Sequence, residues 1–341
     1  MRAAFLHDWL TVFAGSERVL EHMLELQPES PVFTMVHAPK EFEGTGIARH
    51  PVRTSILQRF PKATERYRML LPVMPLLVEQ FDLSDFDLVV SNVKAVCHGA
   101  LTAPHQVHVA YVNRPMRYAW DSYHQELRVR GLDRGLKGAL ARPLYHYLRM
   151  WDHQAMQRPD VLAANSRYVQ AMVRKYYGRD AEVIYPPVEV EEFSCTEDRD
   201  DYFVTVSRLV PYKRADVVVR AFNELGLPLK VIGSGPLEER FRAMARPNVE
   251  ILGWVSREEL RRLVQRARAM VFAAEEEFGI APVEALAAGA PVIAYARGGV
   301  TETVVPFETG ILFEEQTPRS LAGAVREHAS GNHRFEPERL R

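Results

Sequence analysis

The chain has little cysteine, no long apolar run and no excess of one charge. Its 341 residues include only two cysteines, Cys97 and Cys195, so we expect neither a disulfide framework nor a cysteine metal cluster. A reducing cytoplasm is the simplest compartment for such a chain. The formal net charge of −1 gives no overall attraction to nucleic acid, which we therefore do not expect as a partner.

We also expect neither a signal peptide nor a membrane-spanning segment. The first residues, MRAAFLHDWL, lack the long apolar core of a signal peptide. The longest apolar stretch, residues 69–78, has only ten residues and contains two prolines, so it is too short to span a bilayer. We therefore expect a cytoplasmic protein that is soluble or peripheral on the inner face of the cell membrane.

Short apolar runs alternate with amphipathic segments of helical period along most of the chain. Strands separated by helices imply parallel sheets that are covered on both faces, which predicts an α/β fold. The expected strands span residues 3–7, 31–36, 86–91, 107–112, 160–166, 182–186, 202–207, 229–233, 249–253, 269–274 and 291–296. The expected helices include residues 167–177, 214–225, 237–245, 257–267 and 281–288.

A pair of prolines near the middle divides the chain into two expected domains. The length by itself suggests two domains. Pro186 and Pro187 are followed by the acidic stretch 189–201, a composition that suits a linker. We therefore expect an N-terminal domain over residues 1–186 and a C-terminal domain over residues 187–341.

The segment 275–304 carries the strongest signal of a ligand site. Glu276 and Glu284 lie eight positions apart, on either side of a helix start expected near Ile280. Free backbone N–H groups at a helix start favour anionic oxygens, and carboxylates accept hydrogen bonds from sugar hydroxyls. Solvent-facing glutamates are the ordinary alternative, but small residues such as Gly279 indicate close packing where a ligand approaches.

Basic residues and glycines follow two further expected strands. Arg208 and Lys213 frame a strand–helix junction, where they can clamp a pyrophosphate and stabilise the charge of a departing diphosphate. Gly233 and Gly235 follow the next strand and permit close approach of the backbone to phosphate. The alternatives are solubilising surface residues for the two cations and an ordinary tight turn for the two glycines.

Two segments of the first half are candidates for the other side of such a site. Gly15 follows the first strand and would let the N-terminal domain approach a ligand, although a plain turn with Ser16 as helix N-cap fits equally well. The segment 108–126 is dense in arginine and aromatic residues, which suits either a substrate-facing loop or an interdomain packing surface. Its candidate acceptor-binding residues are Arg114, Arg117 and Tyr118.

Together these motifs resemble those of a large family of retaining glycosyltransferases with the GT-B fold, which includes sucrose synthases and bacterial mannosyltransferases. The run EEEFGIAPVEALAAGAPVIA is similar to the family signature, and SRLVPYKR, GSGP and LGWVSREEL follow the family's order. The segment YVNRPMRYAWDSYH resembles a mannosyltransferase-like branch that builds bacterial surface polysaccharides. The resemblance implies two Rossmann-like domains whose parallel sheets face an interdomain cleft.

The resemblance also implies roles for individual residues. Arg208 and Lys213 would bind the diphosphate, and Glu276 would contact hydroxyls of the donor sugar. Glu284 would hold the ribose, and the segment 253–255 would lie beside the base. The residues implied to bind the donor are Gly15, Gly233, Gly235, Gly253, Trp254, Val255, Phe278, Gly279, Ile280 and Glu284.

Asn113 is the main departure from the family pattern, because relatives commonly have a histidine near the reacting sugar (YCHTPMRY against YVNRPMRY). Asparagine can bond a sugar hydroxyl but cannot carry a proton at neutral pH. Because Asn113 occupies the position of that histidine, it is a candidate catalytic residue together with Arg208, Lys213 and Glu276.

The expected reaction is sugar transfer with retention from a GDP- or UDP-sugar, first GDP-mannose, to a saccharide or polyprenyl-linked saccharide. No cofactor and no metal are expected, since Asp198 and Asp200 lie in the acidic stretch and no Asp-x-Asp pair ends an expected strand. A GT-B epimerase or hydrolase of the sugar nucleotide is one alternative. A non-catalytic sugar-nucleotide-binding subunit, suggested by Asn113, is another.

Two basic segments of the first half suggest docking on an anionic membrane. Residues 53–68 carry five basic residues against Glu65, and the apolar stretch 69–78 follows at once. Residues 128–149 add six basic residues against Asp133. A basic segment joined to an apolar one suits an anionic membrane surface as partner. A core helix hairpin with a solvated basic face is the alternative.

Overall fold

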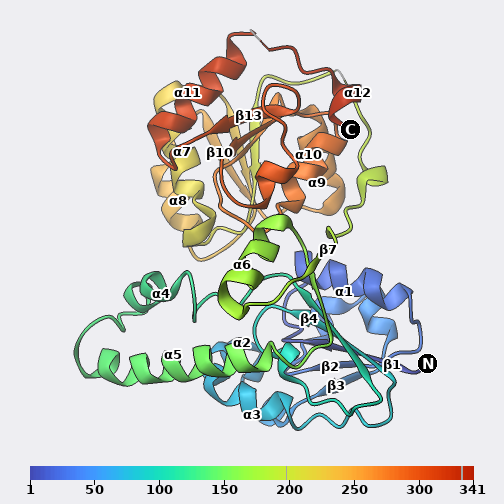
Figure 1. Ribbon diagram of the computed structural model, residues 1–341. Coiled ribbons are helices and arrows are strands. Elements are labelled where there is room, and N and C mark those ends of the chain that lie inside the picture. Colours follow the sequence, from blue (N-terminus) through green and yellow to red (C-terminus); the bar gives the residue numbers. More distant parts are fainter. Residues whose placement is uncertain (197, 332) are drawn as a thin grey trace. The chain divides into compact units, whose positions relative to one another are not determined.

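The computed structural model describes residues 1–196, 198–331 and 333–341 and shows two compact α/β units (Figure 1). Unit 1 spans Met1–Pro187 and unit 2 spans Val188–Arg341. Glu197, in the acidic stretch expected to be a linker, lies outside the described residues. Among the helices of the described residues, none combines the length and apolar character that crossing a membrane requires.

Unit 1 is built on a parallel sheet, which has seven strands in the described structure, in the order β3-β2-β1-β4-β5-β6-β7. The strands are β1 (Ala3–His7), β2 (Val32–Thr34), β3 (Val52–Thr54), β4 (Leu88–Val93), β5 (Val107–Val112), β6 (Val161–Ala164) and β7 (Glu182–Val183). The α-helices are α1 (Gly15–Glu25), α2 (Ala63–Arg66), α3 (Met74–Val78), α4 (Tyr123–Val129), α5 (Gly135–Ala155) and α6 (Arg167–Tyr177). The short 3-10 helices are η1 (Pro39–Phe42), η2 (Gly46–Arg49), η3 (Ile56–Arg59), η4 (Tyr67–Val73) and η5 (Cys97–Gly99).

Unit 2 repeats this plan with a parallel sheet of six strands in its described residues, in the order β10-β9-β8-β11-β12-β13. The strands are β8 (Phe203–Val206), β9 (Leu229–Ile232), β10 (Val249–Gly253), β11 (Ala269–Phe272), β12 (Val292–Tyr295) and β13 (Gly310–Phe313). The α-helices are α7 (Ala215–Leu225), α8 (Glu238–Met244), α9 (Arg257–Arg266), α10 (Ile280–Ala287), α11 (Pro318–Ala329) and α12 (Pro337–Leu340). The 3-10 helices are η6 (Val190–Glu192), η7 (Pro211–Lys213) and η8 (Gly299–Glu302).

Helices cover both faces of the unit 2 sheet. Successive residues of a strand point to opposite faces, so each strand packs against helices on both sides. In β8, Phe203 contacts Phe222 of α7 on one face, with ring centroids 5.2 Å apart. Its neighbour Val204 packs in a second cluster that includes Ala285 of α10. The carboxyl ends of parallel strands lie at one edge, so the loops that follow β8, β9, β10, β11 and β12 gather there.

Local departures from the expected elements have identifiable causes. Strand β3 (VRT) lies at the sheet edge and is largely exposed, so it lacks the apolar run of an inner strand. Helix α7 begins at Ala215 instead of 214, because Arg214 adopts the left-handed conformation with φ 55°. Residues 56–78 form four short helical segments in place of a helix hairpin.

Candidate functional site

The glycines after β9 let two loops of unit 2 run in close contact at the carboxyl edge of the sheet. A Cβ at Gly233 would lie 2.0 Å from the carbonyl oxygen of Ser207, and one at Gly235 would lie 2.6 Å from that of Leu209. Leu209 N–H donates to the carbonyl of Ser234 over 2.9 Å. Side chains at these two positions would collide with the backbone of the loop after β8, which carries Arg208, so close packing of the two loops requires glycine there.

Lys213 and Glu276 come together from two different loops at this edge. The Lys213 ammonium forms an ion pair with Oε1 of Glu276, and each side chain is only 16% exposed. Lys213 ends η7, after β8, whereas Glu276 follows β11. The neighbouring Arg214 donates to Gln316 over 2.6 Å, and Gln316 donates in turn to the carbonyl of Ala273 over 2.8 Å. This bridge ties the two loops together beside the ion pair.

Glu284 is buried within α10 and forms an ion pair with an arginine of the preceding helix, α9. Arg257, the first residue of α9, donates from Nη1 to Oε1 of Glu284 over 2.7 Å. Its Nε donates to Glu192 over 2.8 Å, and its guanidinium lies 5.1 Å from the ring centre of Phe193. The Glu284 carboxylate is the principal cause of the raised pKa of Arg257, since burial acts in the opposite direction. No local sequence pattern marks Arg257 as a site residue.

The loop between Glu276 and α10 is shaped by a second pair of glycines, Gly298 and Gly299, which were not among the predicted site residues. A Cβ at Gly298 would lie 2.4 Å from the carbonyl oxygen of Glu276, and one at Gly299 would lie 2.2 Å from that of Glu277. Gly299 N–H donates to the carbonyl of Glu276 over 2.8 Å. The only available signal was the consecutive pair in ARGGV, directly after an expected strand.

The remaining predicted residues of unit 2 lie at the same strand edge. Gly279 directly precedes α10 and has a φ of 94°, a conformation that favours glycine. Helix α10 begins at Ile280, and Phe278, two residues earlier in the chain, is buried. Gly253 ends β10 with φ 76° and accepts from Gly233 N–H over 2.8 Å. The residues that follow β10 are the exposed Trp254 and the half-buried Val255.

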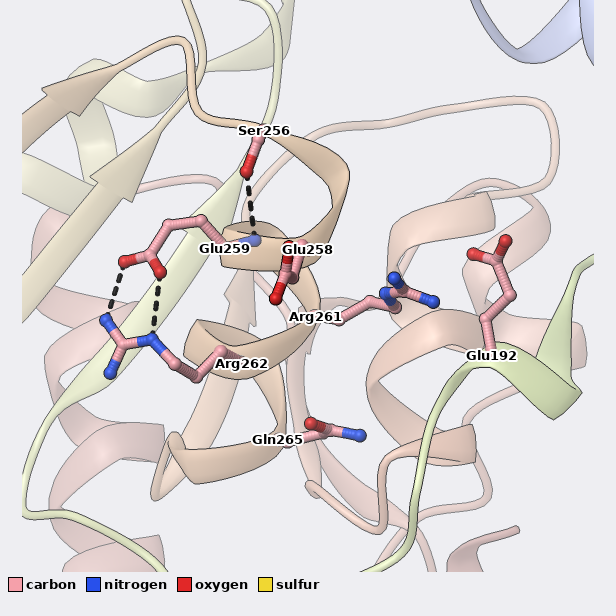
Figure 2. A pocket seen from close by; sticks show the side chains of 7 residues that line it. All are labelled: Glu192, Ser256, Glu258, Glu259, Arg261, Arg262 and Gln265. Atoms are coloured by element: carbon pink, nitrogen blue, oxygen red, sulfur yellow. Dashed lines mark hydrogen bonds and ion pairs between the residues drawn. The ribbon is translucent and has the colours of Figure 1, made fainter.

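A charged hollow beside α9 is lined by residues that sequence analysis did not select, and Figure 2 shows their side chains. Glu259 and Arg262 form an ion pair with each other at 2.6 Å, and Ser256 accepts from Glu259 N–H as the N-cap of α9. Ser256, Glu259 and Arg262 are thus engaged with one another, and we assign no ligand to the hollow.

In unit 1, Gly15 is the first residue of α1, and a buried glutamate holds this first helical turn, called the Gly15 turn below. The N-cap of α1 is Ala14, so the alternative prediction of Ser16 as N-cap is wrong. Oε2 of Glu17 accepts from Ala14 N–H over 3.2 Å and from the Ser16 hydroxyl over 3.0 Å. Asn92, at the carboxyl end of β4, donates to the carbonyl of Ser16 over 2.7 Å.

The other oxygen of Glu17 contacts two basic side chains from the ends of neighbouring strands. Lys94 Nζ lies 2.5 Å and His7 Nε2 3.0 Å from Oε1 of Glu17. Burial favours the neutral acid, but Lys94 and His7 together hold the pKa of Glu17 well below its usual value. Burial, reinforced by Lys94, lowers the pKa of His7. The result is a buried polar cluster behind the Gly15 turn.

The predicted residues that follow β5 are engaged within unit 1. The Asn113 amide donates to Oδ1 of Asn92 and, over 3.3 Å, to the carbonyl of Val93. Through Asn92 it is therefore linked to the turn that contains Gly15. Farther along, Arg114 pairs with Asp121, Arg117 donates to Ser122 over 3.1 Å, and Tyr118 packs on the unit 1 core.

Comparisons with known proteins identify the family for both halves of the chain. Residues 13–192 match the model described as "Glycosyltransferase Family 4", and residues 189–339 match "Glycosyl transferases group 1". An uncharacterized glycosyltransferase of Methanocaldococcus jannaschii is 28% identical over 178 residues, which cover 51% of this chain and 50% of the relative.

A GDP-mannose-dependent alpha-(1-6)-phosphatidylinositol monomannoside mannosyltransferase of Mycobacterium tuberculosis is 32% identical over 202 residues. That match covers 49% of this chain and 52% of the relative, so the chain spans about half the length of the curated relatives it matches. Among solved structures, HepE of Anabaena in complex with UDP and glucose superposes with a TM-score of 0.68 at 17% identity, covering 97% of this chain and 90% of HepE. The chain belongs to glycosyltransferase family 4 and has the GT-B fold.

Proposed function

We propose that this protein transfers a sugar from a nucleoside diphosphate sugar to a saccharide or lipid-linked saccharide, with retention at the anomeric carbon. The observation that carries the proposal is the Lys213–Glu276 ion pair at the carboxyl edge of the unit 2 sheet, four residues before the start of α10, the helix that carries the buried Glu284. Open α/β sheets bind ligands at this edge. Family membership supports the reaction class.

In this proposal the diphosphate leaves from the face on which the acceptor attacks. The acceptor oxygen forms a bond to the anomeric carbon as the bond to the diphosphate breaks, and the acceptor proton passes to the departing diphosphate. Arg208, Lys213 and the start of α10 stabilise the negative charge on that leaving group, so no divalent cation is required. Glu276, held by Lys213, accepts from hydroxyls of the donor sugar.

The nucleotide and sugar are proposed from the relatives. The mycobacterial relative is named for GDP-mannose, and HepE was solved with UDP, so a GDP- or UDP-sugar is the donor class and GDP-mannose the first choice. Thermal shift with a panel of GDP- and UDP-sugars tests this proposal. A donor that raises Tm should be consumed when an acceptor is added, and Glu284→Ala should reduce the shift. A shift for no nucleotide sugar would contradict the proposed function.

Arg257 should position Glu284 for the donor ribose. Replacing Arg257 with alanine should raise the donor KM about tenfold and leave kcat nearly unchanged, because ribose contacts do not change during the chemical step. In the Glu284→Ala background the same change should have little further effect, since the residue acts through that carboxylate. Steady-state kinetics of the four proteins measure this coupling.

The matched control for Arg257 is Arg262→Ala on the same helix. Arg262 also forms an ion pair, but its partner is Glu259, so the donor KM should stay at the wild-type value. Additive effects of the Arg257 and Glu284 changes would show that Arg257 acts on the donor, or on the fold, independently of Glu284.

The acceptor is proposed to be presented at an anionic membrane surface, on the inner face of the cell membrane. In the segment 69–78, Leu71, Met74 and Val78 are buried, whereas Met69 and Leu76 are exposed. The segment therefore keeps an apolar face in solvent directly after the basic residues of 53–68. A polyprenyl-linked saccharide is a suitable acceptor for a protein that docks in this way.

A further inference from the structure

Helix α5 carries two apolar faces, of which only one is covered by unit 1. The covered face contributes Ala141, Tyr145 and Leu148 to the unit 1 core. At its carboxyl end, Trp151 lies against Gly99, where a Cβ would be 2.4 Å from the indole ring and 3.3 Å from Val78 of α3. The carboxyl-terminal half of α5 therefore packs on unit 1, next to α3.

The second apolar face of α5 is exposed along the length of the helix. Leu136 is 77% exposed and Leu140 is 70% exposed, and the same face continues with Leu144, Tyr147 and Met150. Spacings of four, four, three and three residues place these side chains on one stripe of an α-helix. In Figure 1, the amino-terminal half of α5 extends beyond the sheet of unit 1, and the carboxyl-terminal half lies along the unit. We call this set the α5 stripe.

The charged residues that α5 carries beside the α5 stripe are basic. Between residues 135 and 150 they are Lys137, Arg142 and Arg149, and this part of the helix has no aspartate or glutamate. Arg134 and Lys137 adjoin its first leucine, whereas Arg149 turns inward and lies 5.0 Å from the ring centre of Tyr123. If two copies paired through this stripe, their like-charged flanks would face each other. An anionic surface instead complements the flanks.

We propose that the α5 stripe inserts into the headgroup layer of an anionic membrane while the flanking basic side chains contact lipid phosphates. Exposed leucines supply an apolar contribution that salt does not screen, and the arginines and lysine supply one that salt does screen. The proposal deepens the proposed function, on which it rests for the location of the acceptor. Docking itself is measured without donor or acceptor.

An environment-sensitive fluorophore on Leu140→Cys tests the insertion directly. Cys97 is buried, so a Cys195→Ser background leaves the new thiol as the labelling site. Emission should rise and shift to the blue on vesicles of phosphatidylglycerol and phosphatidylcholine, and should stay unchanged on phosphatidylcholine alone. The same label at the exposed position 250 of unit 2 should not respond.

A pair of double variants separates the stripe from exposed leucines in general. Leu136→Asp with Leu140→Asp should lower partitioning onto anionic vesicles at least about tenfold, because two apolar side chains are lost from the inserted face. The control is Leu26→Asp with Leu101→Asp in the same unit, where Leu26 is 78% exposed, and its partitioning should match the wild type.

The outcomes of these measurements separate the proposal from its rivals. A fluorescence change that follows protein concentration without vesicles would identify a second copy as the occupant and overturn the proposal. The absence of a vesicle response at low salt would overturn it as well. Both double variants should retain wild-type transfer to a soluble saccharide acceptor, so a failure of docking is distinguishable from a failure of the proposed transferase activity.

Discussion

Replacing Lys213 by alanine should lower kcat by on the order of 10²-fold and change the donor KM much less. The Lys213 ammonium is largely buried against Glu276, in surroundings where its charge is poorly screened. The Lys213 charge stabilises the transition state more than the bound donor, because negative charge develops on the departing diphosphate only as its bond to the sugar breaks. Steady-state kinetics with saturating acceptor measure the separation of kcat from KM.

The design around Lys213 has internal controls. Lys230→Ala removes a lysine of the same unit that lies 4.3 Å from the ring centre of Tyr202, and it should leave kcat unchanged. Arg208→Ala should lower kcat as Lys213→Ala does, since both cations are proposed to act on the leaving group. Wild-type kcat in both alanine variants would show that neither Arg208 nor Lys213 stabilises the leaving group.

The family motifs were readable from the sequence because each is a local strand–loop–helix unit. Glycines, a basic pair and two glutamates stand at fixed distances from apolar runs, and the parallel sheet then brings them to one edge. The ion pair between Lys213 and Glu276 joins two such units. The order of the motifs indicated that both would lie at this edge, but not that they would pair.

The supporting residues were not predictable, because their partners are distant in sequence. Arg257 and Glu284 belong to different helices, and Lys94 reaches Glu17 across 77 positions. A lone arginine at a helix start or a lone lysine after a strand has no local pattern that distinguishes it from a surface residue. The α5 stripe was hidden for another reason: its leucines follow the same helical period as a face that packs inward.

Replacing Asp8 by alanine should lower the free energy of unfolding of unit 1 by about 3 kcal/mol or more. Asp8 is completely buried after β1, and its carboxylate accepts four backbone N–H groups from residues 94–97, at 2.5 to 2.9 Å. Alanine would leave these donors without their acceptor in a site that water does not reach, so the penalty exceeds that of one lost hydrogen bond.

Amide hydrogen exchange measures the loss in unit 1 alone, because peptides from unit 2 serve as an internal reference in the same sample. The matched control is Asp87→Ala, whose carboxylate also accepts a backbone N–H, from Arg2 over 2.7 Å, but is 54% exposed. Water replaces an exposed acceptor at little cost, so this variant should exchange like the wild type. Equal protection of β1 and β4 in both variants would mean that the 94–97 loop finds other acceptors. The larger expected loss for Asp8 also predicts a looser Lys94–Glu17 contact, because Lys94 belongs to the loop that Asp8 holds, and the Gly15 turn would loosen with it.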